Sequence, residues 1–100
     1  MKEYIDRLNK AFDNRVRLGI MSALAANESL DFNRLKELLD LTDGNLASHL
    51  KALEKESYIT FEKSFVDRKP KTTYSISKAG KAAFEDHINA LEAIIKNQIQ

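Results

Sequence analysis

The stretch of sequence that decides the fold is residues 41–84, LTDGNLASHLKALEKESYITFEKSFVDRKPKTTYSISKAGKAAF. It opens with leucines at the intervals of one helix face: Leu46, Leu50 and Leu53. Thr42 stands before these leucines as a favourable N-cap, so we expect a helix from there to about Glu56. The outward face of this helix carries mostly polar or small side chains: Asn45, Ser48, His49, Ala52 and Lys55.

After this helix the pattern becomes typical of β-strands. Residues 58–65 are rich in aromatic and β-branched side chains, three of which share one parity: Ile59, Phe61 and Phe65. Residues 72–76 are a second expected strand, with two inward side chains: Tyr74 and Ile76. The intervening VDRKPK, residues 66–71, contains the only proline and predicts the turn of a β-hairpin with a basic tip. Ser77 then caps a last long helix.

Three helices are expected before residue 41. Residues 3–12 have apolar side chains at helical spacing and predict a short amphipathic helix. Asp13 or Asn14 can cap a second helix, which is apolar on most sides and therefore central to the core. Asp31 or Asn33 can cap a third, with three leucines inward: Leu35, Leu38 and Leu39.

The expected order is thus four helices, a β-hairpin and a long helix. The tight turn between the third and fourth helices contains Gly44 and is the connection of a helix-turn-helix motif. A hairpin directly after the second helix of such a pair makes it a winged helix. We therefore expect a mainly α fold with a β-hairpin wing (α+β), forming a single domain over residues 1–100.

Three motifs resemble those of a known family: TDGNLASHLKALEK (42–55), YITFEKSFVDRKPKTTYSIS (58–77) and SKAG (77–80). They are similar, in order, to the recognition helix, the wing and the start of the last helix of small bacterial transcriptional regulators. These regulators are related to the MarR and ArsR groups, and the likeness is greatest to a compact winged helix DNA-binding branch. NRVRLGIMSAL (14–24) is similar to the second helix of that branch, so the resemblance covers about residues 12–90.

The resemblance implies a transcriptional regulator that binds double-stranded DNA. We expect it to act as a homodimer on a pseudo-palindromic operator in the cytoplasm, with repression favoured over activation. One position departs from the family pattern, because the family usually has glycine where Ser57 stands. A left-handed residue often follows a helix, and serine there costs about 1 kcal/mol relative to glycine.

A helix that enters the major groove needs short or flexible polar side chains near its N-terminus. The fourth helix offers such residues at its start: Thr42, Gly44, Asn45, Ser48 and His49. The asparagine can pair with adenine, and the histidine can donate to a guanine acceptor or a phosphate. Three cations are expected to meet phosphates or to remain free surface charges: Arg34, Lys51 and Lys55.

The wing segment is locally basic although the chain has a net charge of only +1. Three cations near its tip suit phosphates or a narrow minor groove: Arg68, Lys69 and Lys71. Two hydroxyls that follow are candidate phosphate donors: Thr72 and Thr73. The alternative for this segment is a solubilising turn.

Both ends of the chain carry surplus apolar surface. The last helix, about residues 78–99, has a heptad-like stripe: Phe84, Ile88, Leu91 and Ile95. The helix over residues 3–12 offers a matching face: Tyr4, Ile5, Leu8 and Phe12. We expect these two helices to form a homodimer interface; the alternative is that they pack on each other within one chain.

Composition excludes several other classes. Without cysteine there is no disulfide, thiolate metal site or cysteine nucleophile. Two histidines are too few for a zinc site, so no metal is expected, and His87 is interpreted as an interface or surface residue. No phosphate loop or nucleophile elbow is present, so neither an enzyme nor a cofactor is expected. The short apolar runs and the charged start MKEYIDRLNK predict neither a membrane span nor a signal peptide.

Two other functions are compatible with this fold. A winged-helix module for protein–protein contact would have an apolar outward face on the fourth helix, which the polar residues there argue against. A regulator that responds to a small-molecule effector is the second, although no residue identifies such a ligand.

Overall fold

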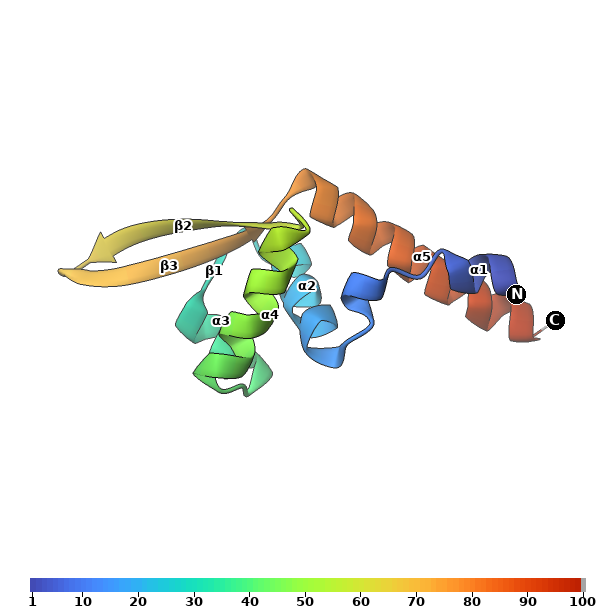
Figure 1. Ribbon diagram of the computed structural model, residues 1–100, viewed down its shortest axis with the longest axis horizontal. Helices are drawn as coiled ribbons and strands as arrows, with labels where there is room; N and C mark the ends of the chain where they lie inside the picture. The colour runs from blue at the N-terminus through green and yellow to red at the C-terminus, as the bar shows by residue number, and fades with distance from the viewer. Residues whose placement is uncertain (100) are drawn as a thin grey trace.

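The computed structural model describes residues 1–99, with side chains through Asn97. The elements follow in the order α1 (Lys2–Asp6), η1 (Lys10–Phe12), α2 (Arg15–Ala26), β1 (Leu30–Asp31), α3 (Phe32–Leu39), α4 (Asp43–Lys55), β2 (Ile59–Val66), β3 (Lys69–Ile76) and α5 (Lys78–Ile99). The strands form one antiparallel sheet in the order β1-β3-β2, and β2 and β3 project from the helices as a wing (Figure 1). The expected winged helix fold is confirmed.

The molecule is elongated. Its principal extents are 57, 25 and 21 Å, with the wing at one end and α1 lying along α5 at the other (Figure 1). The radius of gyration is 15.2 Å, whereas a compact chain of this length has about 13 Å. Both projecting ends therefore leave surface that a rounder domain would bury.

The helices begin at side-chain caps. The Asn14 side chain accepts from the backbone N–H groups of Val16 and Arg17, and Thr42 Oγ1 accepts from Asn45 N at 3.2 Å. Asp31 accepts from the third residue of its helix at 2.7 Å. The expected caps of α2, α3 and α4 are therefore confirmed, with Asn14 and Asp31 as the choices among the alternatives.

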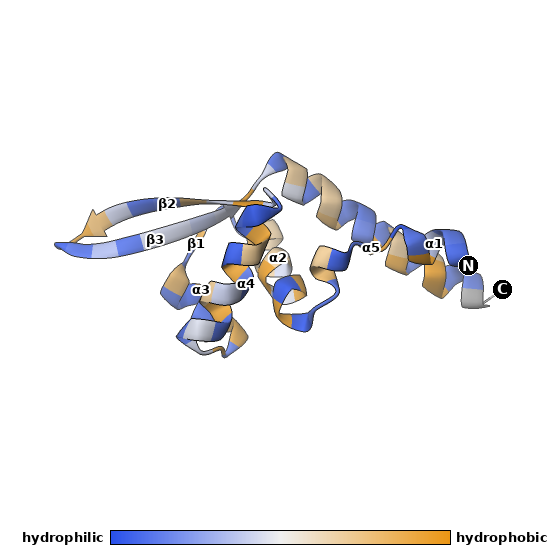
Figure 2. Cartoon of the chain, in the orientation of Figure 1, coloured by the Kyte–Doolittle hydropathy of each residue, from blue (hydrophilic) through white to orange (hydrophobic). Residues whose placement is uncertain are grey.

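The core lies where α2, α3 and α4 meet the base of the sheet (Figure 2). Its fully buried large side chains come from these three helices: Ile20, Met21, Leu24, Leu35, Leu46, Leu50 and Leu53. Ile59 and Tyr74 add the sheet's contribution. The prediction that Leu38 points inward is wrong, because it is exposed and lies about 100° around α3 from half-buried Leu39.

The N-terminal segment differs from the single helix predicted over residues 3–12. Helix α1 ends at Asp6, and a 3-10 turn, η1, follows after Asn9. The Asn9 side chain accepts from Ala11 N at 2.9 Å, and its backbone N–H donates to His87 Nδ1 at 3.0 Å. Because that N–H serves the histidine, it is not available to an α-helical ladder, and the helix breaks here.

The wing turn is tighter than the six residues predicted. Val66 pairs with Lys69, so the turn consists of Asp67 and Arg68 alone, with φ of 51° and 67°. Positive φ at both positions is what a two-residue hairpin turn requires. Pro70 lies inside β3 opposite Phe65. This position lies next to the pair that closes the turn, so the nitrogen that lacks a hydrogen faces away from β2.

Most of β2 leaves the body of the molecule. Only Ile59 of this strand is buried, whereas Phe61 and Phe65, on the same parity, are 50% and 78% exposed. The prediction that Tyr74 lies inside is correct, because this residue sits in β3 near the base of the hairpin, beside β1. Parity alone does not show where a sheet passes beyond the helices that cover it.

Ser57 joins α4 to the sheet in a left-handed conformation, with φ of 63°, as predicted. Ser57 N donates to the carbonyl of Glu54 and Tyr58 N to that of Leu53, the two hydrogen bonds of a Schellman motif. Ser77 Oγ donates to the Ser57 carbonyl at 2.6 Å and accepts from Gly80 N at 2.9 Å. Ser77 therefore both caps α5, as predicted, and ties it to the end of α4.

Candidate nucleic-acid interface

The first half of α4 presents the polar face that the sequence predicts. Asn45 and Ser48 are exposed, whereas Leu46 and Leu50 on the opposite side are buried. Thr42 and Gly44 are also exposed at the start of this helix. A Cβ built on Gly44 meets nothing within 4 Å, so this end of the helix is open to a large partner.

His49 differs from its neighbours because it is half-buried and engaged by another helix. Arg17 Nε, from α2, donates to His49 Nδ1 at 3.0 Å. Partial burial, and then the positive charge of Arg17, lower the pKa of His49. Arg17 is a residue that the sequence reasoning missed, because helical spacing within α2 does not say which part of α4 it will face.

The predicted phosphate partners on α3 and α4 are exposed, and one of them is paired with a carboxylate. Arg34 lies 3.6 Å from Glu37 on the same helix, with both side chains exposed. Exposed pairs contribute about 0–1 kcal/mol, so such a cation can exchange its partner for a phosphate. Two other predicted phosphate partners, Lys51 and Lys55, are exposed on α4.

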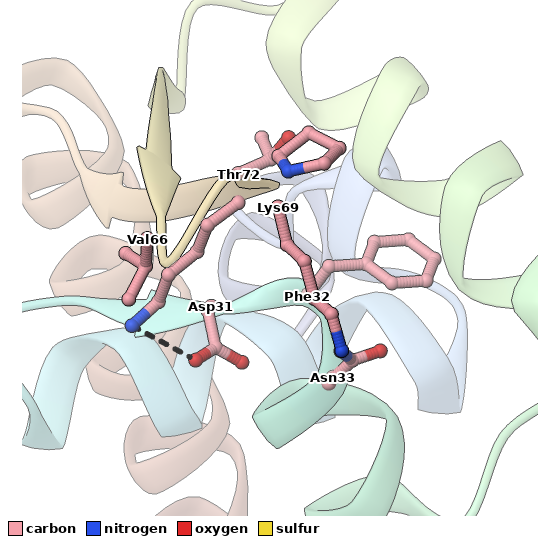
Figure 3. A pocket seen from close by; sticks show the side chains of 8 residues that line it. Asp31, Phe32, Asn33, Val66, Lys69 and Thr72 are labelled. Atoms are coloured by element: carbon pink, nitrogen blue, oxygen red, sulfur yellow. Dashed lines mark ion pairs between the residues drawn. The ribbon is translucent and has the colours of Figure 1, made fainter.

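The wing carries its cations in two different settings. Arg68 and Lys69 are exposed at the turn. Lys71 lies 3.6 Å from Asp31 and so connects the wing to β1 (Figure 3). An open groove lies here between the wing and the start of α3, and it is lined by these residues: Asp31, Phe32, Asn33, Val66, Lys69, Pro70, Lys71 and Thr72.

The two predicted hydroxyl donors lie behind the tip. Thr72 and Thr73 are half-buried in β3, and Thr73 is opposite Asp31 in the register of β1. The structure thus separates the wing into an exposed tip and a base that is fastened to the body. In the part of the chain that the structure describes, no three His, Cys, Asp or Glu side chains gather as metal ligands would.

Phe12, one of the residues assigned to a dimer interface, belongs to the interior of the chain. Phe12 is buried and contacts Phe84 edge-on at 5.8 Å between ring centroids. The ring centroid of Tyr58 lies 5.3 Å from that of Phe12. Phe12 is therefore not available to a second copy, because the chain buries it to fasten η1 to α5, whereas the assignment of half-buried Phe84 to a dimer contact stays a prediction.

The interpretation of His87 as a surface or interface residue is also wrong. It is 6% exposed, accepts from Asn9 N, and packs edge-on against Phe12 at 5.3 Å. Burial lowers the pKa of His87, and the nearby Asp13 charge opposes that effect.

The remaining residues of the predicted interface lie on α1, on α5 and, for Leu8, in the segment between α1 and η1. Ile5, Ile88 and Ile95 are 51%, 40% and 60% exposed. The other members are half-buried: Tyr4, Leu8 and Leu91. Helix α1 packs on α5 of its own chain (Figure 1), as the intramolecular alternative predicts, yet an apolar strip remains uncovered.

The fold, a polar exposed helix in the helix-turn-helix position and a basic wing define a class of protein, the DNA-binding transcriptional regulators, which are not enzymes. Residues 16–95 match the family described as "Winged helix DNA-binding domain", and the chain belongs to this family. Among residues 1–99, no helix combines the length and apolar character needed to cross a membrane.

Several known proteins are similar to this chain in sequence or fold. The transcriptional regulator homologue from Pyrococcus horikoshii OT3 has 32% sequence identity and a TM-score of 0.89, with 98% of each chain covered. An uncharacterized protein of Methanocaldococcus jannaschii is 40% identical over 88 residues, which are 88% of this chain and 96% of that protein. Bacillus subtilis PadR, solved with operator DNA, shares the fold at 19% identity and a TM-score of 0.67, over 75% of this chain and 48% of PadR.

Proposed function

We propose that this protein represses transcription by occupying a pseudo-palindromic operator as a homodimer in the cytoplasm. The observation that carries the proposal is the exposed polar face of α4, which lies on the same chain as an exposed basic wing tip. A helix of this kind enters the major groove, and a basic hairpin meets phosphates or the adjacent minor groove. An apolar face on α4 would instead favour protein–protein contact.

Asn45, Ser48 and His49 are the proposed readers of base edges. They lie near the N-terminus of α4, the end that enters the groove in helix-turn-helix proteins. Asparagine can bond adenine at two atoms, and a histidine donor suits guanine. Six other residues are the proposed backbone contacts: Arg34, Thr42, Lys51, Lys55, Arg68 and Lys69. Phosphate contacts are also proposed for Lys71, Thr72 and Thr73, and these contacts require a phosphate to enter the groove beside the wing.

The homodimer is proposed from the uncovered apolar strip on α1 and α5. Ile88 and Ile95 lie seven residues apart on one face of α5, with Leu91 between them, which is the spacing of a helix–helix seam. Burying this strip against a second copy about a two-fold axis places two α4 helices for half-sites about 34 Å apart. In this arrangement residues 1–100 form a single domain, and α1 and α5 form the dimer contact.

The finer assignment to a MarR- or ArsR-like subgroup is part of this proposal and rests on the order of the motifs in residues 42–80. Repression follows from geometry, because a dimer seated on a promoter excludes polymerase without any catalytic step. A small-molecule effector is not needed for this mechanism.

Selection of bound duplexes from a random library is the experiment that tests the proposal. The expected result is an enriched sequence with approximate two-fold symmetry and half-sites one helical turn apart. Sedimentation of the free protein at micromolar concentration should give twice the chain mass of 11.4 kDa. Enrichment of a single asymmetric half-site by a monomer contradicts the dimer, and the absence of any enrichment contradicts operator recognition.

A further inference from the structure

Arg17 and His49 form a hydrogen bond whose direction admits only one reading. Arg17 Nε lies 3.0 Å from His49 Nδ1. A guanidinium is protonated at every pH a protein experiences, and it carries donors but no acceptor. Nδ1 must therefore supply the lone pair. In the neutral imidazole the proton then sits on Nε2, so this nitrogen is a donor.

The Nε2 atom of His49 is not fully buried. Among the described residues, no hydrogen bond reaches it, and no buried side-chain nitrogen or oxygen lacks a partner. An unpartnered Nε2 on a half-buried residue is therefore accessible. His49 stands on α4 one turn after Asn45, so a ligand that covers this face meets an N–H group and not a lone pair.

Arg17 is well placed to impose this state. Its backbone N–H is held at 3.1 Å by the Asn14 cap, which fixes the first turn of α2. The guanidinium is planar, so the direction of its Nε–H follows from the position of the side chain. Burial and the charge of Arg17 lower the pKa of His49, which agrees with a neutral ring near pH 7.

We propose that Arg17 is a positioning residue that fixes His49 as a hydrogen-bond donor toward DNA through Nε2. This donor pairs with groups that offer a lone pair, which are guanine N7 or O6, adenine N7 and thymine O4 on base edges and phosphate oxygens on the backbone. It discriminates against the amino groups of adenine and cytosine at the same place. This inference rests on the proposed reading of DNA by α4 and names the chemistry that one of its residues selects.

Nitrogen NMR of the imidazole rings in the free protein tests the first step without DNA. In the unmodified protein, we expect His49 to show an unprotonated Nδ1 and a protonated Nε2. Arg17→Met removes the donor while keeping an unbranched side chain, and should give a mixture of both ring forms. Arg17→Lys keeps a charged donor and should retain most of the single form. A protonated Nδ1 in the unmodified protein overturns the proposal.

Binding to the selected operator tests the second step. Replacing the contacted purine by its 7-deaza analogue should weaken binding by the unmodified protein about tenfold. The same replacement should affect Arg17→Met less, because its His49 ring is a mixture of both forms, and should not affect His49→Ala, which has no ring. A loss seen only with a methylphosphonate at the neighbouring phosphate still supports the donor and identifies a backbone acceptor. The assignment is overturned if binding responds to neither change and is also insensitive to removal of a guanine O6 or thymine O4 acceptor at the contacted position.

Arg15→Met is the matched control for charge. Arg15 is exposed at the start of the same helix and is two residues from Arg17. Its replacement removes the same charge and should leave the His49 ring form and the response to the 7-deaza purine unchanged. If Arg15→Met alters both as Arg17→Met does, the effect is electrostatic and the proposal fails. If no duplex is selected at all, the proposed function fails while the ring-form measurement still stands or falls alone.

Discussion

Ser57 shows how a single residue sets the passage from α4 to the sheet. It holds a φ of 63° in a Schellman motif, a conformation that is easier for glycine because it has no Cβ. We therefore expect Ser57→Gly to raise the free energy of unfolding by up to about 1 kcal/mol. Urea titration measures this change, and a fall in the midpoint contradicts the expectation.

Ser57→Ala is the control for that prediction. Alanine keeps the Cβ and the backbone hydrogen bonds, including the carbonyl that accepts from Ser77 Oγ at 2.6 Å. It should give no gain in stability, so an equal gain in both variants would place the effect in the lost hydroxyl and not in the backbone conformation.

His87 links stability to pH. Burial lowers its folded pKa below the unfolded value of 6.5, so between the two values the unfolded chain binds more protons. The resulting stability is complete above pH 6.5 and is lost as pH falls through the folded pKa. The slope contributed by one such group is at most about 1.4 kcal/mol per pH unit.

His87→Asn is the variant that isolates this contribution. The asparagine oxygen can still accept from Asn9 N, but it does not titrate. We expect a less stable protein at neutral pH, because the contact of the ring with Phe12 is lost, and a smaller fall in denaturant midpoint between pH 7 and pH 5. An equal fall in denaturant midpoint between pH 7 and pH 5 for the two proteins would show that His87 does not cause the pH dependence.

At the scale of elements, the sequence predicts those features that are local. The caps Thr42 and Ser77 and the stripe of α4 depend on neighbours within a few positions, and all were placed correctly. The break at Asn9 depends on a histidine 78 positions away, which no spacing rule can show. The tight wing turn was missed because its residues, Asp67 and Arg68, contain no glycine to signal positive φ.

In the candidate site too, local features could be predicted from the sequence and contacts between distant residues could not. The outward face of α4 could be predicted because its periodicity is clear. The partner of His49 could not, because it depends on how α2 crosses α4. The wing cations were identified by composition, but the engagement of Lys71 by Asp31 required the register of β1.

The wing should act through charge. Replacing Arg68 and Lys69 with alanine removes two exposed cations at the tip, so specific and non-specific affinity should fall together. The slope of log K against log salt should become shallower by about two, since each lost phosphate contact changes it by about 0.9. Fluorescence anisotropy over a salt series measures both quantities.

Lys2→Ala with Lys10→Ala is the matched control for the wing. It removes the same number of exposed cations from α1 and η1, which lie away from the wing tip (Figure 1). The slope should stay nearly constant in this variant. An equal flattening in both variants would mean that overall charge, and not the wing, determines the salt dependence.

At the scale of the whole molecule, the elongated shape leaves apolar surface that a single chain does not bury. The aromatic cluster around Phe12 fastens η1 to α5, so the chain completes its own core at that point. Beyond it, α5 continues to Ile99 and carries an apolar strip that α1 covers only in part. The sequence predicted surplus apolar surface at both ends, but it could not show which of those residues the chain itself would use.

The dimer prediction follows from that uncovered strip. Ile88→Glu with Ile95→Glu places two charges on exposed positions, so each chain should keep its fold, as circular dichroism can verify. Facing a second copy, the same charges are costly to bury, and the protein should sediment as a monomer of 11.4 kDa. Operator affinity should fall about 10²–10⁴-fold, because one half-site no longer holds the other recognition helix nearby.

Asn89→Glu is the control on the same helix. Asn89 is exposed and lies about 100° around α5 from Ile88, away from Leu91 and Ile95. This variant should remain a dimer with nearly full operator affinity, which separates a general effect of negative charge near DNA from loss of the interface. A double glutamate variant that stays dimeric, or an unmodified protein that binds its palindrome tightly as a monomer, contradicts the model. The first outcome would place the dimer contact elsewhere, and the second would require the two-fold symmetry of the operator to arise from two chains that bind independently.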